Sequence, residues 1–237
     1  MKFDINDLKV LYEDNHIIVV VKPVGIPVQQ DKTGDLDMLS IIKEYLKEKY
    51  NKPGNVYLGL VHRLDRMVGG VMVFAKTSKA ASRLSSYIRE KNFKKRYFAI
   101  VNGKLNVTNE NIVLKNFLVK NERLNMSRVC EKNVKNSKEA ILEYKVVSNF
   151  TYKNKEYSKV DINLLTGRHH QIRVQFANIG CPLYGDIKYG NKINKVGQNL
   201  ALWSYYLSFF HPTKDDYLEF TFLPNEYVNH DKIWECE

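Results

Sequence analysis

The sequence predicts an α+β fold with a mixed, mainly antiparallel central sheet, flanking helices and a catalytic cleft. Two observations carry this prediction: strand patterns outnumber helical ones, and neighbouring strands often follow each other directly along the chain. With 237 residues, 44% of them hydrophobic, the chain can bury a full core without disulfides or metals. We therefore expect residues 1–237 to form a single catalytic domain.

The first part of the chain alternates extended and helical patterns. Residues 8–21 predict two strands around a turn, and the prolines and glycine of residues 22–28 predict a loop. Apolar residues at helical spacing predict a helix over residues 36–50. The short apolar runs 57–61 and 70–75 predict buried strands, so the residues between them form a loop at strand ends.

A second helix is expected next, capped by Thr77 or Ser78, with Ala81, Leu84 and Ile88 on its inner face. The rest of the chain reads mostly as strands. They are expected at residues 96–101, 112–114 (a weak signal), 140–147, 159–165, 200–209 and 217–222.

Charge is gathered into blocks. The net charge is +11, from 37 Lys and Arg against 26 Asp and Glu. Residues 76–96 hold eight basic residues and one acid, and residues 115–138 hold seven and two. After Lys214 the balance reverses, with seven acids against one lysine. Solubility alone explains such an excess less well than a polyanionic partner does, because bound phosphates release condensed counterions.

The compartment follows from cysteine usage and hydropathy. The three cysteines are scattered and form no C-x-x-C pair, which is typical of reduced thiols and not of a zinc site. The longest aliphatic run, residues 17–21, is far shorter than a membrane span, and the N-terminal residues 1–7 carry acids where a signal peptide is apolar. We expect a soluble, cytoplasmic monomer with no membrane partner.

The densest chemical cluster is His62-Arg63-Leu64-Asp65-Arg66, in the loop between two apolar strands. An Asp in such a loop often only caps a turn or pairs with an arginine. Here two arginines and a histidine flank the carboxylate of Asp65. An ionised, oriented carboxylate can act as a nucleophile or as a general base.

A second cluster, residues 165–173, turns the chain into a helix with Ile172, Phe176 and Ile179 on one side. His169 and His170 suggest a metal, but adjacent helical residues point about 100° apart and do not chelate one ion. The turn is better suited to binding an anion, because free backbone N–H groups and the helix dipole face it.

A third cluster, residues 94–99, places Tyr97 and Phe98 directly after three basic residues. An ordinary strand with a basic preface explains this pattern equally well. The functional alternative is an aromatic ring beside cations, which suits stacking on an exposed base.

These pieces, in this order, resemble the RluA-type pseudouridine synthases, which isomerise uridine in ribosomal or transfer RNA. The resemblance covers nearly the whole chain. It rests on Lys22-Pro23-Val24-Gly25-Ile26-Pro27-Val28, His62-Arg63-Leu64-Asp65 with residues 70–77, Lys95-Arg96-Tyr97-Phe98-Ala99, Leu165-Thr166-Gly167-Arg168-His169-His170-Gln171-Ile172-Arg173 and residues 180–186. It implies a pseudouridine synthase fold and an RNA-binding isomerase active in rRNA or tRNA processing.

The resemblance also implies roles. Asp65 is the catalytic aspartate, Tyr97 packs on the target base, and Arg173 is the basic partner of the aspartate. Arg63 holds the RNA once the uridine is flipped, and Leu165 forms part of the apolar wall. The remaining substrate-binding candidates in the same motifs are His62, Arg168, His170 and Gln171.

The sequence departs from the family pattern in two places. After Arg66 the family commonly has Asp-Thr-Ser-Gly, whereas this chain has Met67-Val68-Gly69-Gly70, which puts RNA contacts near that loop in doubt. Many relatives carry a small RNA-binding domain before the first motif, and Lys22 leaves too few residues for one. We expect a short form in which the catalytic domain itself selects its target.

Pseudouridine formation breaks an N–C bond and joins the same base through carbon, so no cofactor and no metal is expected. The sequence has neither a glycine-rich dinucleotide loop nor a P-loop. Two other functions compete: a catalytically inactive RNA-binding protein of the same fold, and another nucleic-acid enzyme such as a nuclease or glycosylase. The first is disfavoured by the presence of Asp65, Tyr97 and Arg173, and a nuclease by the lack of clustered acids. The residues leave open whether Asp65 attacks the base, attacks the sugar or removes a sugar proton.

Overall fold

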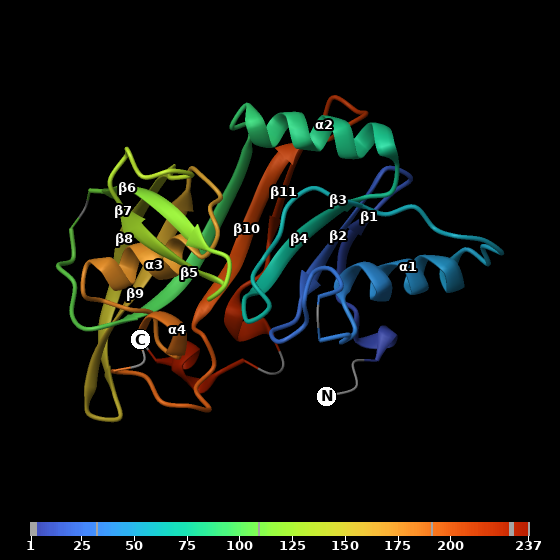
Figure 1. Cartoon of the computed structure of the whole chain (residues 1–237). Helices are drawn as coiled ribbons and strands as arrows, with labels where there is room; N and C mark the ends of the chain where they lie inside the picture. Colours follow the sequence, from blue (N-terminus) through green and yellow to red (C-terminus); the bar gives the residue numbers. More distant parts are fainter. Residues whose placement is uncertain (1–3, 32, 109, 191, 228–229, 237) are drawn as a thin grey trace. The chain divides into compact units, whose positions relative to one another are not determined.

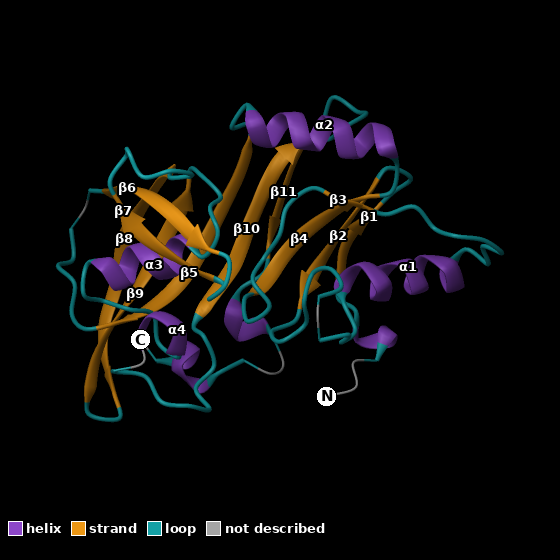
Figure 2. Cartoon of the chain, viewed as in Figure 1, coloured by secondary structure: helices purple, strands orange, loops and turns teal. Residues whose placement is uncertain are grey.

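A computed structural model describes residues 4–31, 33–108, 110–190, 192–227 and 230–236 (Figure 1). The chain forms two compact units. Unit 1 is Met1–Lys94 with Ser204–Phe222, and unit 2 is Lys95–Trp203 with Leu223–Glu237. Each unit combines strands with helices (Figure 2), which confirms the predicted α+β class.

The strands of unit 1 run in the order β1-β2-β4-β10, with β3 beside β4 and β11 beside β10. The pairs β1–β2, β2–β4, β3–β4 and β10–β11 are antiparallel. The bounds are β1 Val10–Glu13, β2 Ile17–Lys22, β3 Gly59–Leu60, β4 Gly69–Ala75, β10 Leu202–Phe210 (in unit 1 from Ser204) and β11 Tyr217–Thr221. The two strands predicted within residues 8–21 and the strand at 70–75 are confirmed.

The helices of unit 1 begin where the sequence places capping residues. Asp37 accepts hydrogen bonds from the Leu39 and Ser40 N–H groups at the start of α1 (Met38–Lys49). Thr77 caps α2 (Ser78–Arg89) through the Ala80 N–H. A short 3-10 helix, Ile5–Asp7, precedes β1.

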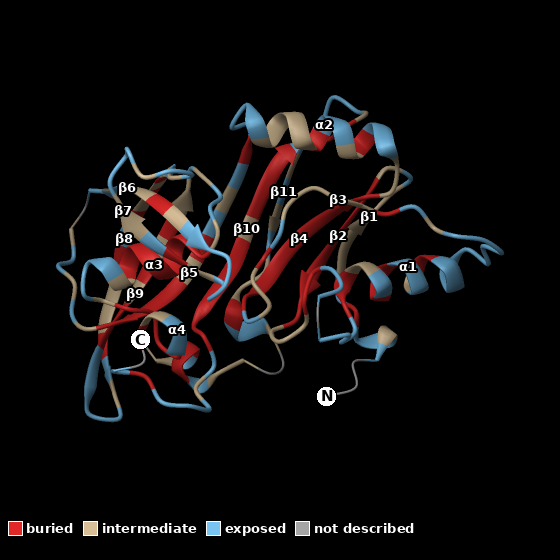
Figure 3. Cartoon of the chain, in the orientation of Figure 1, coloured by how far each residue is buried: buried red, intermediate tan, exposed pale blue. Residues whose placement is uncertain are grey.

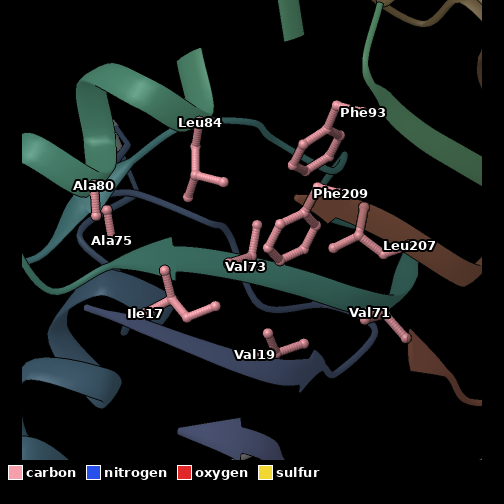
Figure 4. Close-up of a cluster of buried hydrophobic side chains, with 10 residues drawn as sticks. All are labelled: Ile17, Val19, Val71, Val73, Ala75, Ala80, Leu84, Phe93, Leu207 and Phe209. Carbon is pink, nitrogen blue, oxygen red and sulfur yellow. The ribbon is translucent and has the colours of Figure 1, made fainter. Parts of the chain in front are cut away.

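The core of unit 1 is aliphatic and aromatic. Every residue of β2 and β4 is buried (Figure 3). One face of these strands packs on α2 through Ala80 and Leu84, as Figure 4 shows. Phe93 stacks on Phe209 with ring centroids 5.2 Å apart. Burying each large apolar side chain contributes about 1.5–3 kcal/mol, so this packing fixes the strands that carry the loop of Asp65.

Gly70 fits a position that no other residue tolerates. Its φ is +122°, and an added Cβ would lie 2.1 Å from the carbonyl oxygen of Ser204. The close approach of β4 to the Ser204 backbone therefore requires glycine at the start of β4.

Unit 2 is built on strands in the order β5-β9-β8-β6-β7, and all four of these pairings are antiparallel. The bounds are β5 Phe93–Asn102 (in unit 2 from Lys95), β6 Ile112–Asn121, β7 Met126–Cys130, β8 Lys138–Tyr152 and β9 Lys155–Leu164. The helices are α3 Gln171–Asn178 and α4 Ile187–Gly190, with 3-10 helices at Pro224–Glu226 and Lys232–Glu235. Phe176 of α3 packs edge-on against Tyr144 of β8, with ring centroids 5.0 Å apart.

Four sequence expectations need correction. The strand predicted at 57–61 is only Gly59–Leu60, because Tyr57 is half exposed. The weak strand at 112–114 is a full hairpin, β6–β7, whose alternation is weak because Val113 is apolar and exposed. Ile179 does not face the core; it follows α3 and is 39% exposed. In α2 the fully buried alanine is Ala80, and Ala81 is only partly buried.

Among the residues that the structure describes, no helix is long and apolar enough to cross a membrane. Cys130, Cys181 and Cys236 are free thiols, each partly exposed.

Candidate active site

The loop of residues 61–68 joins β3 to β4 in unit 1 and carries Asp65. Leu64 and Val68 are buried, whereas Arg63 is exposed and Asp65 partly exposed. The Val68 N–H donates to the Asp65 carbonyl at 3.0 Å, which closes a turn around the carboxylate residue. Val68, where the family commonly has a hydroxyl side chain, therefore anchors the loop through apolar burial.

His62 lies at the entrance of this loop. Its Nε2 accepts the backbone N–H of Val73 at 3.1 Å, and its ring lies 5.4 Å from that of Phe93. The imidazole thus accepts a hydrogen bond from a backbone N–H of β4 and holds the loop against β4.

Lys22 is a site residue that sequence reasoning missed. It ends β2 opposite Gly70 and is fully buried. Its Nζ donates to the carbonyls of Pro23 at 2.7 Å and Arg66 at 3.0 Å. Burial lowers the pKa of Lys22 to about 7, with the Asp65 charge raising it and Arg66 lowering it. A cation directly before a proline in a wholly apolar strand is the signal that could have identified it.

Arg66 ties the Asp65 loop to the segment after β2. Its Nε donates to the Gly25 carbonyl at 2.9 Å, and the Gly25 N–H returns a bond to the Arg66 carbonyl at 2.9 Å. Its guanidinium donates to Thr33 and pairs with Asp35 at 2.5 Å. Hydrogen bonds from Thr33 and Arg66 lower the pKa of Asp35. Arg66 therefore orders this segment.

Tyr97 lies in β5 of unit 2, opposite Ile162 of β9, and is 5% exposed. Lys95, two residues earlier, lies close to Gly167 of the Leu165–Arg173 motif. A Cβ added to Gly167 would be 3.7 Å from the Lys95 Nζ. Burial lowers the pKa of Lys95. The Lys95–Ala99 segment and the turn at residues 165–168 are thus neighbours within this unit.

That turn is held by its own side chains. The Thr166 hydroxyl bonds the backbone of Ile141 and donates to Gln171 Oε1 at 2.8 Å. The same oxygen of Gln171 accepts the Arg168 N–H at 3.0 Å. Leu165 is 40% exposed, and the Arg168 side chain donates to the Glu139 carbonyl. Gln171 is buried and closes the turn, while Leu165 is the member of the group with the most open surface.

Arg173 forms a buried, bidentate ion pair in unit 2. Its Nε and Nη2 both donate to Asp186 at 2.7 Å, and both side chains are almost fully buried. Asp186 also accepts the N–H groups of Lys188 and Tyr189. The family resemblance implies Asp65 as the partner of Arg173 and implies no role for Asp186, so this bidentate pair is a contact that the motifs do not predict.

The two adjacent histidines have other partners. Their rings stack at 3.8 Å, His169 Nδ1 lies 3.0 Å from the Ser127 hydroxyl, and His170 Nδ1 lies 2.8 Å from the Tyr189 hydroxyl. His170 precedes α3 with φ +53° and gives it no side-chain cap. Within the described ranges, no group of three or more His, Cys, Asp or Glu is placed to hold a metal ion.

The predicted site residues therefore fall into two groups. His62, Arg63 and Asp65 share one loop of unit 1. The others belong to unit 2, namely Tyr97, Leu165, Arg168, His170, Gln171 and Arg173.

Comparison with known families decides the assignment. The family model described as RNA pseudouridylate synthase matches residues 16–178. The chain belongs to this family of RNA pseudouridine synthases. It is accordingly an isomerase that acts on RNA, and the resemblance drawn from the sequence motifs is confirmed.

Curated relatives agree. An "Uncharacterized RNA pseudouridine synthase" of Aquifex aeolicus is 34% identical over 90% of this chain and 68% of the relative. The "Ribosomal large subunit pseudouridine synthase C" of Buchnera aphidicola is 34% identical over 92% of this chain and 67% of its own length. The chain thus spans about two thirds of the length of these family members.

Solved structures show the same fold. Human RNA Pseudouridylate Synthase Domain Containing 1 has a TM-score of 0.75 and 23% identity, covering 96% of this chain and 89% of its own. Human RNA Pseudouridylate Synthase Domain Containing 4 has a TM-score of 0.76 and 23% identity, covering 97% of this chain and 94% of its own. The predicted pseudouridine synthase fold is confirmed.

Proposed function

We propose that this family member converts specific uridines of ribosomal RNA to pseudouridine, with Asp65 as the catalytic carboxylate. The observation that carries the proposal is the family match over residues 16–178, which includes Asp65, Tyr97 and Arg173. The names of two relatives, "Ribosomal large subunit pseudouridine synthase C" and "D", support ribosomal RNA as the substrate. Transfer RNA is the alternative substrate.

The chemistry balances without a co-reactant. The bond from N1 of uracil to C1′ of ribose breaks, the base rotates, and a bond from C5 to C1′ forms. The C5 proton leaves to solvent and N1 gains one, so nothing is oxidised or reduced. The target base has to leave its stack before a carboxylate can reach the sugar–base bond.

The remaining roles divide between binding and catalysis. Unstacking a base costs a few kcal/mol, and stacking on an aromatic ring returns about 1–3 kcal/mol. We assign that stacking to Tyr97, which β5 already holds in place, and assign to Arg63 the hold on the flipped RNA. Arg173 supplies the cation that orients the catalytic carboxylate. The substrate-binding assignments are His62, Leu165, Arg168, His170 and Gln171.

The two basic blocks are assigned to the RNA backbone. The block of residues 76–96 lies on α2 and the start of β5. The block of residues 115–138 includes most of the β6–β7 hairpin and the segment after it. RNA affinity should therefore fall steeply with salt, because each neutralised phosphate releases counterions. We propose that residues 1–237 act as one monomeric catalytic domain in the cytoplasm.

Carbodiimide-based mapping of pseudouridine tests this function. RNA from cells that lack the gene is compared with RNA from cells that carry wild type or Asp65→Asn. We expect one or more ribosomal RNA positions to lose pseudouridine without the gene, regain it with wild type, and stay unmodified with Asp65→Asn. Loss confined to transfer RNA would move the substrate to that class. An unchanged map, with the protein still bound to RNA, would favour the catalytically inactive binding protein.

A further inference from the structure

Tyr189 sits at the centre of the polar network around Arg173. It belongs to α4 and its backbone N–H donates to Asp186. Its ring lies 5.3 Å from the guanidinium carbon of Arg173 and packs edge-on against His170, with centroids 5.6 Å apart. One tyrosine therefore contacts two residues of the Leu165–Arg173 motif.

The hydroxyl of Tyr189 lies within hydrogen-bond distance of a backbone N–H and of an imidazole nitrogen. The Ser127 backbone N–H, from β7, donates to the hydroxyl oxygen at 2.8 Å. An amide N–H can only donate, so the oxygen is the acceptor in that bond. The phenol keeps its own proton, and His170 Nδ1 lies 2.8 Å from the oxygen, in position to accept it.

A hydrogen bond from the phenol to Nδ1 requires one form of the imidazole. A ring nitrogen that accepts a hydrogen bond carries no proton, so neutral His170 holds its proton on Nε2. The neighbours restrict the ring further: His169 stacks on it at 3.8 Å, and His169 Nδ1 contacts the Ser127 hydroxyl at 3.0 Å. Ser127 thus fixes both histidines, one through its side chain and one through Tyr189.

We propose that Tyr189 is a positioning residue for the reaction. Its ring holds the guanidinium of Arg173 from one side while Asp186 holds its edge, and its hydroxyl fixes His170 as the tautomer that donates through Nε2. The link to turnover rests on the proposed function, whereas the tautomer is a property of the protein alone.

The tautomer is tested by nitrogen NMR of labelled histidine in the full chain, at about pH 8, where an ordinary imidazole is neutral. In wild type we expect His170 to show an unprotonated Nδ1 and a protonated Nε2. Tyr189→Phe removes only the hydroxyl and should abolish this preference. Tyr157→Phe, which alters another buried tyrosine of unit 2, should leave it unchanged. A protonated Nδ1 in wild type, or an identical spectrum in Tyr189→Phe, would overturn the assignment.

Turnover tests the ring. Tyr189→Phe keeps the aromatic face under Arg173, so turnover at saturating RNA should stay within about threefold of wild type. Tyr189→Leu removes that face and should lower turnover at least about tenfold. Equal turnover in the two variants would overturn the role of the ring. If Tyr189→Leu does not fold, Tyr189→Met, a longer side chain that also lacks an aromatic face, takes its place and should lower turnover by a similar factor. Wild type without any turnover would refute the proposed function, and the NMR result would still decide the tautomer.

Discussion

The two compact units hold their motifs by different physical means. In unit 1 the Asp65 loop rests on β2 and β4, which are buried along their whole length, and most of its polar contacts have a backbone group as one partner. Lys22 and the Gly25 N–H both donate to the Arg66 carbonyl. In unit 2 the motif turn is held by side chains, chiefly Arg173 on Asp186 and His170 against Tyr189.

This difference predicts different sensitivities to substitution in the two units. A backbone group on an apolar sheet keeps its position when most side chains are changed, since the sheet fixes where the carbonyls lie. A buried side-chain network depends on every member, because a charge left without its partner in a low dielectric is costly. Unit 2 should therefore be the more sensitive to single conservative substitutions of polar residues.

The largest effect is expected from Asp186→Asn. Asparagine can still accept the Lys188 and Tyr189 N–H groups, so the change removes mainly the charge opposite Arg173. Breaking a buried ion pair costs about 3–5 kcal/mol. The unfolding free energy, measured in urea, should fall by that amount, and turnover should fall with it because Arg173 loses its orientation.

The matched control is Asp161→Asn in the same unit. Asp161 pairs with Arg96, whose side chain is 47% exposed. An exposed pair of this kind is worth about 1 kcal/mol or less. Equal losses of stability in the two variants would contradict the view that the buried network dominates unit 2.

A smaller effect is expected from Lys22, and it depends on pH. Burial holds the pKa of Lys22 at about 7 in the folded chain, below its ordinary 10.5. Between these values the unfolded chain binds more protons, so the unfolding free energy rises with pH. This contribution, up to about 1.4 kcal/mol per pH unit, should be absent in Lys22→Met. Urea unfolding at several pH values between 7 and 10 measures it, and parallel curves for the two proteins would refute the lowered pKa of Lys22.

The smallest effect on stability is expected from Arg66→Ala. The Arg66 side chain is 39% exposed and that of Asp35 is 50% exposed, so the unfolding free energy should change by about 1 kcal/mol or less. Residues 33–35 should nevertheless exchange their amide hydrogens faster, since Arg66 holds Thr33 and Asp35. Arg66→Lys should restore protection only in part, because an ammonium lacks the planar fork. Unchanged exchange in Arg66→Ala would mean that the segment is ordered without it.

Sequence patterns predicted most of unit 1 and less of unit 2. The apolar runs of β2 and β4, the helical spacing over residues 36–50 and the cap at Thr77 are local signals, and the structure confirms each element they predict. The β6–β7 hairpin escaped because apolar and polar residues do not alternate in β6: Val113 is apolar and exposed, and Phe117, Leu118 and Val119 follow one another. Local pattern thus predicts elements whose apolar residues match their burial and misses those in which they do not.

For the candidate site, sequence order found the motifs but not their partners. Residues 62–66 and 165–173 are each contiguous, so their chemistry is visible in the sequence. Lys22 bonds the carbonyl of a residue 44 positions away, and Ser127 bonds the hydroxyl of Tyr189 across 62 positions. Contacts between residues so far apart in the sequence depend on the fold, and local residue spacing does not predict them.

The central claim is that Asp65 makes this chain an RNA pseudouridine synthase. Its most direct test is tritium release from RNA labelled at C5 of uridine, because the C5 proton leaves only when the base is rejoined through carbon. Wild type should release tritium, and Asp65→Asn should release none while binding the same RNA within a few fold, since affinity comes mainly from phosphates. Release by Asp65→Asn at the wild-type rate would contradict the claim.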